Sequence, residues 1–83
     1  MKSIEVILYS KENCSLCEQA KGVLHKINKE IPLSIKEVDI YKDDALLEEY
    51  QIRIPVIVRN DEVLDEGIIS ENTVRKRLLL KIK

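Results

Sequence analysis

The pair of cysteines near the N-terminus is the feature of this 83-residue sequence with the clearest chemistry. Cys14 and Cys17 are separated by two residues, a spacing that lets the two thiols form an intramolecular disulfide and be reduced again. As a purely structural bridge, the same disulfide would close a loop too short to constrain much of the unfolded chain. The spacing therefore favours a redox-active dithiol over a stabilising crosslink.

Metal binding is the competing chemistry for two cysteines at this spacing. A structural zinc ion requires four ligands, and besides its two thiols the chain offers one histidine, His25. His25 lies eight positions after Cys17, which is about 12 Å along a helix. At that distance it can neither share an ion with the cysteines nor act as a general base for Cys14. We expect no metal site.

The residues around the dithiol are predicted to form a strand, a turn and a helix. Residues 4–9 are rich in β-forming side chains, and the polar residues 10–13 are typical of a turn. After Cys14, apolar residues recur at steps of three and four, which indicates one face of an amphipathic helix that ends before Pro32. That face consists of Cys17, Ala20, Leu24, Ile27 and Ile31.

The start of this helix gives the two cysteines different environments. A helix N-terminus has backbone N–H groups without partners and behaves like about half a positive charge. Cys14 receives this field, which stabilises its thiolate, and Lys11 adds a nearby positive charge. Cys17 lies on the apolar face and is expected to be less exposed and less acidic. We therefore predict that Cys14 is the nucleophile and Cys17 the resolving thiol.

The rest of the chain alternates between strand and helix patterns. Residues 33–40 are predicted as a second strand, and Asp43-Asp44 can cap a short helix over residues 45–50. The turn signal Asn60-Asp61 separates a third strand, residues 53–58, from a fourth, residues 62–65. A last helix is predicted to begin at Ser70 and to place Val74, Leu78 and Ile82 on one face.

This order of elements, β-α-β-α-β-β-α, indicates an α/β protein. The first β-α-β unit implies two parallel strands joined by a right-handed crossover, and the turn at residues 60–61 implies an antiparallel hairpin. The sequence therefore predicts a four-stranded mixed sheet flanked by helices, in a single domain over residues 1–83.

Composition excludes several classes of function. Fourteen basic residues against fifteen acidic ones give a net charge of −1, which argues against nucleic-acid binding. No apolar run approaches the roughly 18 residues needed to cross a bilayer. The first residues lack the apolar core and cleavage site of a signal peptide. We expect a cytoplasmic protein with no membrane or nucleic-acid partner.

A proline adds to the meaning of the dithiol, because Ile54-Pro55 lies just before the core of the third predicted strand. Together with Tyr9-Ser10-Lys11, Cys14-Ser15-Leu16-Cys17 and Gly67 after the hairpin, it resembles the thioredoxin superfamily, and more closely its glutaredoxin-like branch. The resemblance spans nearly the whole chain. It implies a thioredoxin-like fold and an enzyme, a thiol–disulfide oxidoreductase that reduces protein or low-molecular-weight disulfides.

The resemblance also implies roles for residues outside the dithiol. The Ile54-Pro55 peptide bond is expected to be cis and to face the two cysteines, with the backbone of Ile54 pairing with the substrate. Lys11 matches a lysine that meets a carboxylate of glutathione in glutaredoxins, and Gly67 matches one glycine of their carboxylate-binding turn. The predicted site therefore consists of the catalytic Cys14 and Cys17 and of the substrate-binding Lys11, Ile54, Pro55 and Gly67.

The expected partners follow from the same resemblance. No cofactor is expected to bind tightly, and the electron donor would be glutathione or a reductase of the thioredoxin-reductase type. The substrate would be a disulfide-containing protein or a small thiol, and the chain is expected to be a monomer. Glutaredoxins commonly carry an aromatic residue where this chain has Leu16, and a Gly-Gly pair after the hairpin, where this chain has the single glycine Gly67. Two alternatives stay open, a redox-sensing or partner-binding module without turnover and a dimer that shares an iron–sulfur cluster through Cys14 and glutathione.

Overall fold

The protein is described by a computed structural model that covers residues 3–82, with no description of the side chains of residues 81 and 82. The order of strands and helices is the predicted one, and a short 3₁₀ turn, η1, is added after the second strand. The elements are β1 (Ile4–Ser10), α1 (Ser15–Asn28), β2 (Leu33–Asp39), η1 (Ile40–Lys42), α2 (Asp44–Tyr50), β3 (Val56–Arg59), β4 (Glu62–Glu66) and α3 (Glu71–Ile82).

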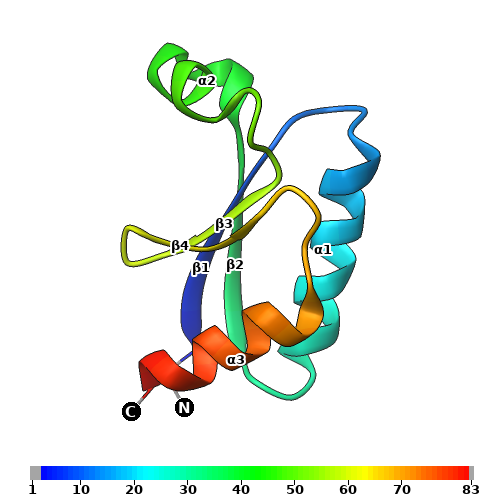
Figure 1. Cartoon of the computed structure of the whole chain (residues 1–83), viewed down its shortest axis with the longest axis vertical. Helices are drawn as coiled ribbons and strands as arrows, with labels where there is room; N and C mark the ends of the chain where they lie inside the picture. Colours follow the sequence, from blue (N-terminus) through cyan, green and yellow to red (C-terminus); the bar gives the residue numbers. More distant parts are fainter. Residues whose placement is uncertain (1–2, 83) are drawn as a thin grey trace.

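The four strands form one mixed sheet in the order β2-β1-β3-β4 (Figure 1). Strand β1 is parallel to β2 and antiparallel to β3, and β4 is antiparallel to β3. The end of β1, the start of β3 and the end of β4 therefore meet at one end of the sheet. The α/β fold with a mixed four-stranded sheet is confirmed, and this end of the sheet carries the loop that contains Cys14.

The hairpin between β3 and β4 turns at the predicted dipeptide. Asn60 and Asp61 have φ angles of 50° and 65°, the left-handed pair that a type I′ turn requires. Asparagine and aspartate tolerate this region better than other residues with a side chain. The local sequence therefore determines where β3 ends and β4 begins.

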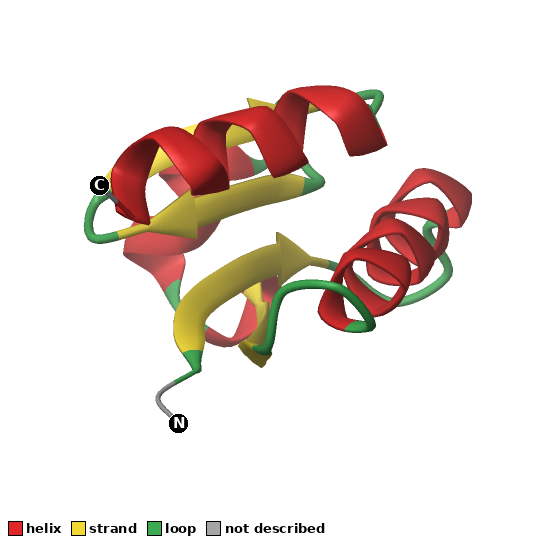
Figure 2. Cartoon of the chain, turned by 90° about the horizontal axis from the view of Figure 1, so that it is seen from below, coloured by secondary structure: helices red, strands yellow, loops and turns green. Residues whose placement is uncertain are grey.

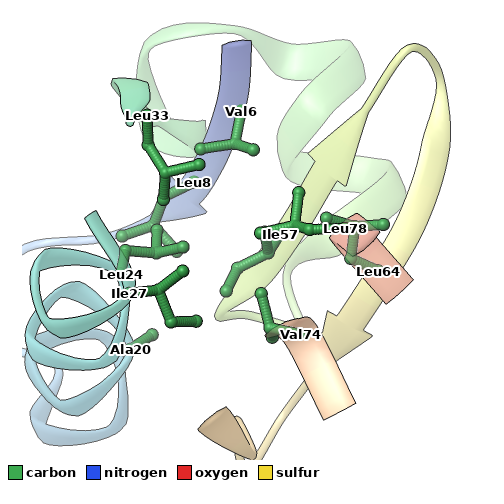
Figure 3. Close-up of a cluster of buried hydrophobic side chains, with 10 residues drawn as sticks. All are labelled: Val6, Leu8, Ala20, Leu24, Ile27, Leu33, Ile57, Leu64, Val74 and Leu78. Atoms are coloured by element: carbon green, nitrogen blue, oxygen red, sulfur yellow. The ribbon is translucent and has the colours of Figure 1, made fainter. Parts of the chain in front are cut away.

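The core lies between the sheet and two of the helices, and its side chains are aliphatic (Figure 3). Leu24 and Ile27 of α1 and Val74 and Leu78 of α3 are fully buried. Helix α3 crosses the end of the sheet opposite the Cys14 loop, where β1 begins (Figures 1 and 2). The remaining members of the cluster are Val6, Leu8, Ala20, Leu33, Ile57 and Leu64.

Three of the boundaries that differ from the prediction have a local cause. Helix α1 ends at Asn28, so Ile31 is not on its apolar face but packs partly against the core from the following turn. The residue before a proline is biased away from helical geometry, and Ile31 precedes Pro32. Strand β3 begins at Val56, because the N–H groups of the two residues before Pro55 both donate to the Tyr50 carbonyl.

The third difference is η1, which replaces the last residue of the predicted second strand. The Asp39 carboxylate accepts the N–H of Tyr41 at 2.9 Å and so starts the turn. The predicted caps are present, since Asp43 caps α2 and the Ser70 hydroxyl accepts the N–H of Thr73 at 3.3 Å. Val74 and Leu78 are buried as predicted, whereas the side chain of Ile82 lies outside the described residues.

We predict that Leu24→Ala lowers the free energy of unfolding by about 2–5 kcal/mol, because it leaves a cavity among fully buried side chains. Urea denaturation followed by circular dichroism measures this loss. The adjacent His25 is exposed, so His25→Ala should change stability by less than about 0.5 kcal/mol. Equal losses in the two variants would contradict the assignment of the core.

Candidate functional site

Cys14 is the N-cap residue of α1. Its backbone is extended, with φ −116° and ψ 109°, and its Sγ accepts the N–H of Cys17 at 3.2 Å. The Cys14 carbonyl accepts the N–H of Glu18 at 3.1 Å, the first bond of the helix ladder. The sulfur therefore satisfies one of the free donors of the helix terminus, in the position that capping oxygens usually occupy.

Cys17 lies one turn further along and faces the core. Its side chain is 2% exposed, whereas that of Cys14 is only partly covered, which is the difference in exposure that the helix pattern predicted. Burial raises the pKa of Cys17 to about 11, the hydrogen bond with Cys14 acts in the same direction, and the backbone and charge of Lys11 act in the opposite direction. Cys17 therefore remains a protonated thiol across neutral pH.

The loop between β1 and Cys14 turns through Asn13, which has a φ of 55°. Asparagine is one of the few residues with a side chain that adopt this left-handed geometry readily. The turn brings the chain from the end of the sheet to the start of α1. Lys11, Glu12 and Cys14 all line the cleft that lies beside this loop.

This cleft has a volume of about 890 Å³ and lies between the Cys14 loop, the start of α1, the end of β2 and the α2 region. Three lysines and five carboxylates line it. Cys14, which also lines this cleft, is thus open to a partner molecule, in surroundings with a small excess of negative charge. The charged lining residues are Lys11, Glu12, Glu18, Lys21, Glu37, Asp39, Lys42 and Asp43.

A polar network among the residues that line the cleft was not predicted from the sequence. The Ser10 hydroxyl, on a residue that is 3% exposed, donates to the Glu37 carboxylate at 3.0 Å. Lys21 Nζ lies 3.2 Å from Glu37 and 3.1 Å from Glu18, and hydrogen bonds to both carboxylates raise the pKa of Lys21. The register of the two parallel strands explains this contact. Ser10 is paired with Asp39, so Ser10 and Glu37 lie at the same end of the sheet.

The Ile54-Pro55 peptide bond is cis, as the resemblance implied, and Pro55 is fully buried. Tyr9 pairs with Val56, so Pro55 lies next to the end of β1, from which the chain leads to Cys14. Ile54 is half-buried. Neither Ile54 nor Pro55 lines the polar cleft, so the two predicted groups of site residues lie on different sides of the end of β1.

Gly67 has a φ of 72° and joins the turn after β4 to the cis-proline loop. Its N–H donates to the carbonyl of Pro55 at 2.8 Å and to that of Arg53 at 3.2 Å. A residue with a side chain would be strained at this φ. The Gly67 N–H is therefore used within the protein, and any contact of Gly67 with a substrate would involve its other atoms.

An aromatic stack next to the cis-proline loop was also not predicted from the sequence. The rings of Tyr9 and Tyr50 are stacked with centroids 4.6 Å apart, and the Arg53 guanidinium lies 5.2 Å from the centre of the Tyr50 ring. Arg53 also pairs with Glu66 at 2.6 Å and with Glu49 at 3.3 Å. These contacts join the end of α2 to the end of β4. Burial and the neighbouring tyrosine raise the pKa of Tyr9.

Within residues 3–82, no three or more histidine, cysteine, aspartate or glutamate side chains gather in a way that could hold a metal ion. The same part of the chain contains no helix that is long and apolar enough to cross a membrane.

A dithiol at the start of the first helix and a cis-proline directly before the third strand, on a mixed four-stranded sheet, define a protein of the thioredoxin fold. The sequence matches the family model of the glutaredoxin-like domain (DUF836) over residues 5–79. The chain therefore belongs to this glutaredoxin-like family of the thioredoxin superfamily. A comparison of this sequence with curated proteins found no match.

Solved structures agree with this assignment. A structural-genomics target protein from X. campestris is 26% identical, with a TM-score of 0.79 over 90% of this chain and 96% of that one. A protein from Nitrosomonas europaea is 22% identical, with a TM-score of 0.81 over 93% of each chain. A mutant thioredoxin from Halobacterium salinarum is 16% identical, with a TM-score of 0.70 over 99% of this chain and 77% of that one. The similarity to the last two structures shows the fold alone.

We predict that iodoacetamide at pH 7 alkylates Cys14 and spares Cys17. With a pKa of about 11, about one Cys17 side chain in ten thousand is a thiolate at pH 7, and its sulfur is buried. Mass spectrometry over time should show labelling of Cys17→Ser that is at least about tenfold faster than labelling of Cys14→Ser. In Cys14→Ser, burial keeps the Cys17 sulfur protected from iodoacetamide. Faster labelling of Cys17 would contradict the site.

The raised pKa of Cys17 also predicts a loss of stability in alkali. The unfolded thiol releases its proton near pH 9.0 and the folded one near pH 11, so the folded state binds more protons between these values. The free energy of unfolding should therefore fall as pH rises through this window, by up to about 1.4 kcal/mol per pH unit from this group. Denaturation at several pH values measures the fall, which should be shallower in Cys17→Ala. Equal slopes in the native chain and in Cys17→Ala would contradict the raised pKa of Cys17.

Proposed function

We propose that this chain is an enzyme, a thiol–disulfide oxidoreductase in which Cys14 is the nucleophile and Cys17 the resolving thiol. The observation that carries the proposal is the contrast between the two sulfurs. Cys14 Sγ caps a helix at the edge of an open cleft, whereas Cys17 is buried and held as a thiol. The membership in a glutaredoxin-like family supports a redox-type module of this kind.

The proposed reaction has two exchange steps. The Cys14 thiolate attacks one sulfur of the substrate disulfide, whose S–S bond breaks, and the other sulfur leaves as a thiolate that takes a proton from water. Cys17 then gives up its proton as its sulfur attacks Cys14 Sγ. The remaining substrate sulfur leaves, and the chain is left with a Cys14–Cys17 disulfide. Two electrons and two protons from a donor restore the dithiol.

The proposal extends to the setting of the reaction. The donor would be glutathione or a reductase of the thioredoxin-reductase type, and the substrate a protein or small-molecule disulfide. The chain would act as a monomer in the cytoplasm, where the donor systems keep thiols reduced. Lys11, at the edge of the same cleft as Cys14, would meet an anionic group of the partner. The neighbouring loops would also bind the substrate, through Ile54, Pro55 and Gly67.

The test is turnover of bis(2-hydroxyethyl) disulfide, a small uncharged disulfide, with dithiothreitol as donor and the uncatalysed rate subtracted. We expect the native chain to reduce many molecules of disulfide per molecule of protein and Cys14→Ser to lose this activity. Cys17→Ser should instead accumulate a mixed disulfide at Cys14, detectable as a mass increase that reductant removes.

His25→Ala is the matched control, because this exposed residue of α1 lies outside the cleft and should leave the rate unchanged. Reduction that stops after one equivalent per protein would indicate a redox switch and overturn the enzyme assignment. Full activity in Cys14→Ser would overturn the assignment of the nucleophile.

A further inference from the structure

The two edges of the sheet differ in how their backbone groups are used. Strand β4 forms one edge, and its register with β3 shifts so that Leu64 has no partner residue. Arg77 of α3 donates from Nη1 to the Leu64 carbonyl at 2.6 Å. A bulge and a covering helix are two of the ways in which proteins keep an edge strand from pairing with another chain. The β4 edge is therefore protected.

Strand β2 forms the other edge and is regular over all of its seven residues. The Ile4 N–H donates to the Pro32 carbonyl at 3.0 Å, and in a parallel ladder the bonds to the neighbouring strand recur at every second residue. The even-numbered residues of β2 therefore bond to β1, and the backbone groups of the odd-numbered ones point away from it. The Leu33 N–H agrees with this pattern, because it donates at 2.7 Å to the Asn28 side chain instead of to β1.

Two outward N–H groups in the middle of this edge are unused. Those of Ile35 and Glu37 have no hydrogen-bond partner among residues 3–82. The side chains of Ser34, Lys36 and Glu37 are exposed, so the edge is accessible from both faces of the strand. An edge of this kind can accept another extended chain, whose backbone then pairs with it as a further strand.

The charges along β2 disfavour a second copy of the chain as the occupant. The antiparallel register that pairs all seven residues of two copies would place the two Lys36 side chains opposite each other. Like charges directly opposite on paired strands are destabilising. A different polypeptide can instead supply residues that complement this strand.

The end of this edge leads into the cleft that Cys14 lines. Glu37 and Asp39 of β2 are both lining residues of that cleft. Its five carboxylates outnumber its three lysines, and one of these lysines, Lys21, is already bonded to Glu37 and Glu18. A chain that lies along the edge and continues into the cleft therefore meets a net negative charge, which a basic segment complements.

We propose that the outer edge of β2 docks the polypeptide substrate, which adds to the four-stranded sheet as a further strand and carries its disulfide into the cleft beside Cys14. The proposal rests on the function proposed above and names its substrate class, an extended segment with a net positive charge in a disulfide-containing protein. Backbone hydrogen bonds to Ile35 and Glu37 supply the affinity, and the carboxylates of the cleft select the charge. Cys14 then attacks the disulfide as described above.

Amide hydrogen exchange in the native chain tests the docking without any turnover. The probe is a peptide of about six residues, the usual length of a strand, that alternates valine with lysine and contains no cysteine. With excess peptide, we expect the exchange of the Ile35 and Glu37 N–H groups to slow at least about tenfold, because each gains a backbone acceptor. The Ile68 N–H, at the turn after β4, is the internal control and should keep its rate. Protection of Ile68 alone, or of none of the three, would overturn the docking.

Single-turnover stopped-flow reactions test whether a docked segment delivers its disulfide to Cys14. The same peptide now ends in a cysteine that is joined to 2-mercaptoethanol by a disulfide, and a matched peptide has glutamate in place of lysine. We expect the lysine peptide to react at least about tenfold faster than the glutamate peptide. Bis(2-hydroxyethyl) disulfide, which cannot pair as a strand, gives the rate without docking.

Methylation of the peptide backbone distinguishes strand pairing from attraction between charges alone. N-methyl groups on two neighbouring residues of the lysine peptide block both of its edges and should slow its reaction about tenfold. The same number of methyl groups on alternate residues leaves one edge free to pair and should preserve the rate. These peptides leave the protein unchanged, so the result does not depend on the folding of a variant.

Ile35→Pro tests the same contact from the side of the protein. It removes one outward N–H without removing a bond to β1, so it should lower the ratio of the lysine-peptide rate to the bis(2-hydroxyethyl) disulfide rate. An unchanged ratio would contradict the docking.

The outcomes separate the two proposals. If bis(2-hydroxyethyl) disulfide is not reduced, the proposed function fails, and the role of the β2 edge in substrate delivery fails with it. If it is reduced but the Ile35 and Glu37 N–H groups are not protected, or methylation of neighbouring residues leaves the rate of the lysine peptide unchanged, only the inference about docking is wrong.

Discussion

The hydrogen bond from the Cys17 N–H to Cys14 Sγ is the interaction on which the rest of the site depends. It makes a sulfur the cap of α1, so the start of the helix and the reactive group are the same structural feature. The helix then turns Cys17 inward, because the residue three positions after the cap falls on the face that packs against the sheet. One local geometry therefore separates two identical side chains into an open sulfur and a protected one.

The end of the sheet supplies the surroundings of that pair. The chain leads from the end of β1 to Cys14, and the antiparallel strand β3 begins beside the end of β1, directly after Pro55. Strand β4 returns to the same end, where the Gly67 N–H is bonded to the Pro55 and Arg53 carbonyls. Strand register and two backbone hydrogen bonds thus hold three loops from distant parts of the sequence. Because backbone atoms make these contacts, the side chains of the loops can differ in polarity.

The local parts of this arrangement could be predicted from the sequence, because short-range patterns specify them. The spacing of the cysteines, the apolar face of α1 and the turn at Asn60 each depend on neighbours within a few residues. The network of Ser10 and Glu37 depends on the register of two parallel strands, which no short-range pattern encodes. The end of α1 was misplaced because the apolar spacing continues to Ile31, although the geometry before Pro32 ends the helix earlier.

The Asp65 carboxylate shows the same limit at the turn that follows β4. In the sequence it is one of two acidic residues before a glycine, and its charge alone says that an anion would be repelled. The structure adds that both oxygens are bound to backbone N–H groups of the turn, so the carboxylate is a fixed part of the loop. The sequence therefore shows the charge, whereas only the fold shows where that charge is held.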